Sequence, residues 1–111
     1  MRTRLEARIG SAPALRNDRA VWEVTDPSGR RVVLNDAAWE HIVAEHPQIG
    51  IDKQDVLAAV AAPTRKIIGR ELGEEWYYLA GPGPTRWLKV VVHYEGREGL
   101  IVTAFPRRAF P

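Results

Sequence analysis

The stretch from Arg65 to Phe105 constrains the fold more than any other part of this 111-residue chain. It contains four segments rich in β-branched and aromatic residues, at 65–71, 75–80, 86–94 and 100–105. The connections between these segments are short and contain glycine, whereas parallel strands would need much longer crossovers. We therefore predict a four-stranded antiparallel meander.

The alternation of side chains along the last two strands predicts how this sheet is oriented. Each strand has a wholly apolar set on one face, namely Leu88, Val90 and Val92 on the third strand and Leu100, Val102 and Ala104 on the fourth. The opposite, mixed face carries Lys89, His93 and Thr103. We expect the apolar sets to pack against helices and the mixed face to meet solvent or a ligand.

Turn and capping signals divide the first half of the chain into a hairpin and two helices. Asp26-Pro27-Ser28-Gly29 is a type I turn signal and predicts a small hairpin over residues 21–34. Helices are expected over about 36–46 and 52–62, because a proline follows each of them. Their sheet-facing apolar residues are expected to be Trp39, Ile42, Val43, Leu57 and Val60. The pattern predicts an α+β fold, with N-terminal helices on one face of a four-stranded antiparallel sheet and a small N-terminal hairpin.

A length of 111 residues favours one domain. We assign a single core to residues 20–111 and a basic N-terminal arm to residues 1–19. No apolar run approaches the roughly 20 residues that span a bilayer, and the N-terminus lacks the apolar region of a signal peptide. The absence of cysteine excludes disulfides and thiolate metal sites. We expect a cytoplasmic protein without membrane contact, or a domain delivered as part of a larger exported or phage protein.

The charges are unevenly distributed, although the net charge is only +2. Residues 20–64 hold three cations against seven carboxylates, whereas residues 65–111 hold eight cations against five carboxylates. A basic sheet half favours a polyanionic ligand on that side. Chance scatter of solvated charges is the alternative interpretation.

The residue types on the mixed face suit chemistry on a phosphate. Cleavage of RNA without a metal needs a base for the 2′-hydroxyl, an acid for the leaving oxygen, and cations for the charge on the phosphorane. Histidine suits the first two roles because its ordinary pKa, about 6.5, lies near neutrality. The candidates are His41, His46 and His93 for acid and base, Lys89, Arg70 and Arg86 for the charge, Thr103 and Tyr77 for a hydrogen bond, and Trp87 for base stacking. No metal or cofactor is expected.

Each candidate also has a purely structural interpretation. His46 lies on the apolar stripe of its helix, where a cation near the C-terminus favours the helix dipole. His41 fits an exposed helix position, and Lys89 and His93 fit ordinary residues on the wet face of an antiparallel sheet. Thr103 is a good strand former, and Trp87 suits a core as well as a stacking platform.

Several short runs resemble the phage and prophage branch of the barnase–EndoU–colicin–RelE-like nuclease superfamily. They are Trp39-Glu40-His41-Ile42, His46-Pro47, Tyr77-Tyr78, the strand at 87–92 and the strand at 101–105. The likeness covers about residues 30–108. It implies helices packed on a four-stranded antiparallel sheet and a metal-independent ribonuclease, often a toxin domain. Catalytic residues differ between branches of this superfamily, so the fold alone does not fix the mechanism.

The leading hypothesis is a metal-independent endoribonuclease, in the form of a toxin domain, with RNA as substrate and a cognate antitoxin or immunity protein as a second partner. The alternative is a non-catalytic module of the same fold that binds nucleic acid or protein. The position of the histidines distinguishes the two. Catalysis needs a histidine beside an uncovered Lys89, whereas scattered histidines or a covered face favour binding.

Overall fold

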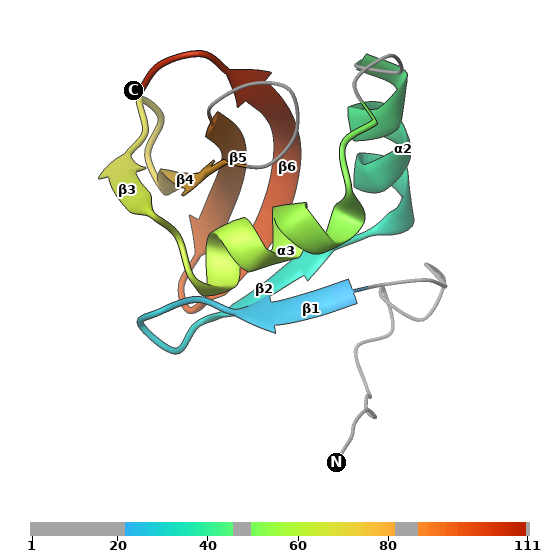
Figure 1. Cartoon of the computed structure of the whole chain (residues 1–111). Coiled ribbons are helices and arrows are strands. Elements are labelled where there is room, and N and C mark those ends of the chain that lie inside the picture. The colour runs from blue at the N-terminus through green and yellow to red at the C-terminus, as the bar shows by residue number, and fades with distance from the viewer. Residues whose placement is uncertain (1–21, 46–49, 82–86, 111) are drawn as a thin grey trace.

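A computed structural model describes residues 22–45, 50–81 and 87–110 (Figure 1). The elements are β1 (Trp22–Thr25), β2 (Arg31–Leu34), α2 (Asp36–Glu45), α3 (Lys53–Ala61), β3 (Arg65–Ile68), β4 (Glu74–Ala80), β5 (Trp87–Glu95) and β6 (Glu98–Arg107). Each lies close to a segment predicted from the sequence. The proposed arm at 1–19 lies outside the described residues, as do His46 and Arg86.

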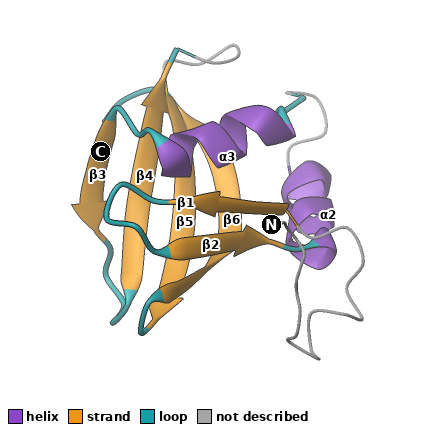
Figure 2. Cartoon of the chain, turned by 90° about the horizontal axis from the view of Figure 1, so that it is seen from below, coloured by secondary structure: helices purple, strands orange, loops and turns teal. Residues whose placement is uncertain are grey.

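The predicted fold class was wrong in its sheet. The strands form one six-stranded sheet in the order β1-β2-β6-β5-β4-β3, not a four-stranded sheet beside a separate hairpin. The meander from β3 to β6 is antiparallel, but β2 pairs with β6 in parallel, which makes the sheet mixed (Figure 2). The physical reason lies in β2, where Val32, Val33 and Leu34 are all buried. A short isolated hairpin is marginal in water, and docking on β6 buries these side chains and pairs an exposed edge.

Both helices pack on the same face of the sheet. Ile42 of α2 and Val56, Leu57 and Val60 of α3 belong to one buried cluster. The sheet contributes Leu34, Tyr77, Val90, Val92, Ile101 and Ala104 to this cluster. Asp52 caps α3 by accepting a hydrogen bond from the Gln54 backbone at 2.8 Å. We call the opposite side of the sheet, which neither α2 nor α3 covers, the outer face.

The predicted orientation of β6 was wrong over its first half. Leu100 and Val102 are 42% and 45% exposed, whereas Ile101 is fully buried. A bulge causes this change, because Val91 pairs with Thr103 while its neighbour Val92 pairs with Ile101, so one residue of β6 is skipped. A one-residue shift moves side chains to the other face. Val43 of α2 was also expected in the core and is 44% exposed.

Candidate functional site

The outer face gathers aromatic rings around cations. The register places Arg65, Tyr78, Lys89 and Phe105 side by side across four strands. The next row, one side-chain repeat along, holds Ile67, Trp76, Val91 and Thr103. Trp87 pairs with Arg107 on the other side of Lys89. This face therefore combines rings with positive charge, as the charge distribution predicted for the sheet half.

Lys89 lies at the centre of these rings. It is only 7% exposed, and its Nζ lies 3.4 Å from the ring centroid of Trp76, 5.4 Å from that of Phe105 and 5.9 Å from that of Tyr78. No carboxylate of the described ranges lies within ion-pair distance of its ammonium group. A buried lysine is rare, and one without a carboxylate partner is rarer. The rings replace the missing counter-ion only in part.

Further cations surround Lys89. Burial lowers the pKa of Lys89, and the nearby guanidinium groups of Arg107 and Arg70 lower it further, while Glu74 acts in the opposite direction. Lys89 therefore has two cations and one carboxylate within electrostatic reach, which gives this group of four side chains a net positive charge. Such a cluster favours an anion, because a bound anion relieves the repulsion.

The turn between β3 and β4 fixes the ring that covers Lys89. The Oε1 of Glu74 accepts hydrogen bonds from the Trp76 indole at 2.9 Å and from the Arg70 backbone at 3.1 Å. Burial raises the pKa of Glu74, but these hydrogen bonds outweigh it, so the pKa lies below its usual range. A Cβ on Gly69 would lie 2.5 Å from that oxygen and 2.6 Å from the Trp76 nitrogen, so a larger residue there would displace this hydrogen-bonded pair. The turn thus orients Trp76.

The histidines are not brought together. His93 is on the outer face, opposite Glu74 across the β4–β5 pair, and its Nε2 lies 3.8 Å from Glu95. It is four residues from Lys89 on one strand, roughly 13 Å away. His41 is exposed on α2, which packs on the other face of the sheet. The described histidines therefore form no acid–base pair around Lys89.

The other predicted residues divide between the two faces. Thr103 is half-buried on the outer face beside Val91, and Trp87 is half-buried there against Tyr78, with 6.2 Å between the ring centroids. Arg70 is exposed in the turn next to Trp76. Tyr77 was expected to contact a phosphate, but it is fully buried on the helix-covered face. That expectation is corrected, because its hydroxyl is bonded within the core.

The site candidates named from the sequence did not include Trp76, Tyr78, Phe105, Arg107 or Phe110, which also lie on this face. A signal for two of them was present, because Trp76 and Tyr78 alternate with Tyr77 along one strand. Assigning Tyr77 to the core would have placed both neighbours on the outer face. Phe110 follows the last strand and has no such signal.

A second group of titratable side chains forms a buried hydrogen-bonded network on the helix-covered side of the sheet, next to the β1–β2 turn. Asp26 accepts hydrogen bonds from the Arg30 backbone at 2.8 Å, from the Arg30 Nε at 2.8 Å and from the Tyr94 hydroxyl at 2.8 Å. Arg30 also donates two hydrogen bonds to Glu75, at 3.0 and 2.7 Å, and its guanidinium stacks on Tyr94. The Tyr77 hydroxyl bonds to that of Tyr94. These contacts tie the β1–β2 turn to the meander.

The electrostatics of this network indicate a structural role. Burial favours a raised pKa for Asp26, but hydrogen bonds from Arg30, Tyr94 and Ser28 hold the pKa well below its usual range. Burial raises the pKa of Tyr77 to about 12 and that of Tyr94 still further. These three groups do not change charge near neutrality, so they are poor acids and bases for catalysis. We regard the network as an anchor.

Replacing Asp26 with Asn should lower the free energy of unfolding at pH 7 by about 2–3 kcal/mol, because charge-assisted hydrogen bonds are lost. The depressed pKa of Asp26 contributes stability that is fully present above the unfolded-state pKa, about 3.9, and is lost as the pH falls below it. Urea denaturation at pH 7 and at lower pH should therefore show a shallower acid decline in Asp26→Asn. Glu23→Gln, which removes an exposed partner of Arg31, is the control and should change stability by less than about 1 kcal/mol. Wild-type stability in Asp26→Asn would contradict the anchor.

Comparisons with known proteins do not identify a family or a function for this chain. No protein-family model matches the chain, and no curated protein or solved structure is significantly similar to it. Neither α2 nor α3, the helices of the described ranges, is long and apolar enough to cross a membrane. The function must therefore be argued from the outer face.

Proposed function

We propose that this protein binds single-stranded RNA on the outer face of its sheet. The observation that carries the proposal is Lys89, which is buried among aromatic rings between Arg70 and Arg107 without a carboxylate partner in the described part of the chain. A phosphate would supply the anion that this cluster lacks. The separation of His41 and His93, the two histidines in the described ranges, favours this binding function over acid–base catalysis by that pair.

The two components of the outer face match the two components of a nucleic acid strand. Cations neutralise backbone phosphates and supply most of the affinity. Aromatic side chains on a sheet stack unpaired bases, which is how several RNA-binding domains recognise single strands. Trp76, Trp87 and Phe105 are half-buried rings on this face. Phe105 pairs with Lys89 and Trp87 pairs with Arg107, while Trp76 lies one row further along, with its ring over the Lys89 ammonium group. A duplex would not offer its bases to these rings.

Metal-independent cleavage of that RNA is a second candidate function, and the lowered pKa of Lys89 favours it. A lysine that loses its proton more easily is a better donor to a leaving 5′-oxygen than an ordinary lysine. Arg70 and Arg107 would stabilise charge on the phosphorane beside it. Incubation of the protein with single-stranded RNA in excess EDTA separates the two functions. Cleavage products ending in a 2′,3′-cyclic phosphate support the nuclease, and intact bound RNA supports binding alone.

Affinity for a uridine oligoribonucleotide of about 12 nucleotides should fall steeply between roughly 50 and 200 mM salt, because phosphate contacts release counter-ions. Arg107→Ala should make the log–log slope shallower by about one unit. Fluorescence anisotropy at several salt concentrations measures this slope. Arg97→Ala is the matched control, since it removes the same charge from the β5–β6 turn at the other end of the strands. Salt-independent binding, or equal effects of the two variants, would argue against a phosphate track over Lys89.

A further inference from the structure

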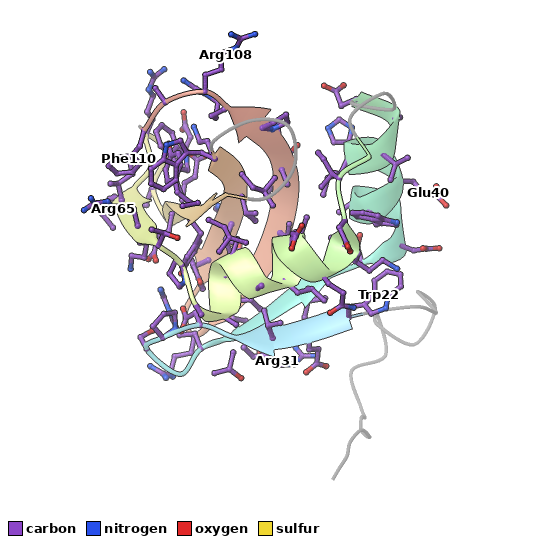
Figure 3. The ribbon with its side chains drawn as sticks, viewed as in Figure 1. Trp22, Arg31, Glu40, Arg65, Arg108 and Phe110 are labelled. Carbon is purple, nitrogen blue, oxygen red and sulfur yellow. The ribbon has the colours of Figure 1, made fainter. Side chains whose placement is uncertain are left out.

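The C-terminal segment places a ring on the outer face. Phe110 packs edge-to-face on Tyr78 with 4.7 Å between ring centroids, and its ring is tilted by 39° against that of Trp87 at 5.5 Å. The guanidinium carbon of Arg65 lies 5.7 Å from the centroid of Phe110 (Figure 3). Two rings and one cation, from three different strands, thus surround one flat side chain.

Tyr78, beneath Phe110, carries an unpartnered hydroxyl. The side chain is fully buried, and its hydroxyl oxygen has no hydrogen-bond partner among the described residues. Burial raises the pKa of Tyr78, so the group is a neutral phenol able to donate one hydrogen bond. A buried hydroxyl without a partner destabilises the state in which it is observed. The arrangement therefore leaves a polar group that a ligand or water would satisfy once Phe110 moves away.

The segment that carries Phe110 continues past the end of β6. β6 ends at Arg107, and the next two residues, Arg108 and Ala109, are exposed. Figure 3 shows Arg108 projecting away from the body of the protein, whereas Phe110 lies beside Arg65. Within the described ranges, the ring of Phe110 is what holds this segment to the sheet.

We infer that Phe110 occupies a subsite for an unpaired nucleobase, formed by Tyr78, Trp87 and Arg65, and that ligand binding displaces it. The inference rests on the proposed function, because it names where one base of the RNA lies. A base is flat and aromatic like the phenyl ring, and its polar edge can accept the hydrogen bond that the Tyr78 hydroxyl offers. Arg65 would face the base as it faces Phe110 now. Phosphates on either side of that base would reach Lys89 and Arg107.

Removing the occupying ring should strengthen binding. Phe110→Ala is expected to lower the dissociation constant for the uridine oligoribonucleotide about fivefold. The reason is that a base would no longer have to displace the Phe110 ring from the subsite. Arg108→Ala is the control in the same segment and should weaken binding slightly or leave it unchanged. Unchanged or weaker binding by Phe110→Ala would overturn the inference, since Phe110 would then be irrelevant or itself part of the stacking platform.

Removing the Tyr78 hydroxyl should separate a ligand contact from a structural one. Tyr78→Phe is expected to weaken RNA binding about threefold to tenfold while the thermal midpoint stays the same or rises. A structural hydroxyl would behave in the opposite way, with a lower midpoint and unchanged affinity, and that result would overturn the inference.

Displacement can be observed directly, because the chain has only two phenylalanines. Fluorine-labelled phenylalanine gives two NMR resonances, and Phe110→Ala identifies the one from Phe110. That resonance should move to a solvent-exposed shift when RNA binds. Measurable RNA binding with an unmoved Phe110 resonance would overturn the inference and leave the proposed function standing. Absence of RNA binding in both wild type and Phe110→Ala would overturn the proposed function and this inference with it.

Discussion

Val90→Asp should unfold the domain. Val90 is fully buried in the middle of β5 and faces the helices within the main cluster. A carboxylate there would be desolvated without a partner, and such substitutions are among the few that cost about 4 kcal/mol or more. Total stabilities of small domains are only about 5–15 kcal/mol, so the protein should lose cooperative unfolding or accumulate in inclusion bodies. Circular dichroism during urea denaturation measures the effect.

Val102→Asp is the matched control, because it makes the same chemical change in the adjacent strand. Val102 is 45% exposed at the bulge of β6, so its substitution should cost less than about 1 kcal/mol. The pair tests the side-chain orientation that the bulge produces. Equal destabilisation by the two variants would contradict it, as would a soluble Val90→Asp protein of nearly wild-type stability.

Lys89→Met should separate stability from function. Methionine keeps most of the side-chain volume among the rings and removes a desolvated charge that has like-charged neighbours. The free energy of unfolding should therefore stay the same or rise. RNA affinity should fall about tenfold or more through loss of a charge-assisted phosphate contact, and any EDTA-resistant cleavage should fall about 10²–10⁴-fold.

Lys66→Met is the control for charge alone. Lys66 is a partly exposed lysine on the edge strand β3, which β4 separates from β5, and it pairs with Glu75 at 3.0 Å on the other face of the sheet. Its replacement should leave RNA affinity within about twofold of wild type after correction for the lower net charge. A destabilised Lys89→Met protein with unchanged affinity would show that Lys89 only fills space between the rings.

Local signals in the sequence were sufficient to predict where the helices and strands lie, but not which strands pair with one another. The Asp26–Gly29 turn and the alternation along β5 are encoded by neighbouring residues, and the structure has both where they were expected. The parallel pairing of β2 with β6 joins Arg31 to Glu98, and no periodicity in either strand specifies it. A predicted hairpin and a predicted meander were therefore left as separate units. What indicates an inner strand is that the side chains on both faces of β2 are buried, and this is seen only in the structure.

The candidate site was predicted only in part, because local signals do not show which residues of other strands lie next to a given side chain. Alternation placed Lys89 on the correct face, but its burial depends on Trp76 and Phe105, which come from two other strands. The exposure of Val102 depends on a bulge that no local signal marked. His41 was grouped with His93 because both are histidines, and their separation by the sheet follows only from how α2 packs. The types of residue alone do not show how far apart their side chains lie in the fold.

The strand order also bears on how the chain folds during its synthesis. β2, in the first third of the sequence, has its inner partner in β6, the last strand, and their ion pair joins residues 67 positions apart. The N-terminal hairpin can therefore find its place only after nearly the whole domain has left the ribosome. Contacts of such long range slow folding and leave strand edges unpaired in the meantime. The three consecutive apolar residues of β2 therefore remain open to pairing with other chains in that interval, which is a risk of aggregation.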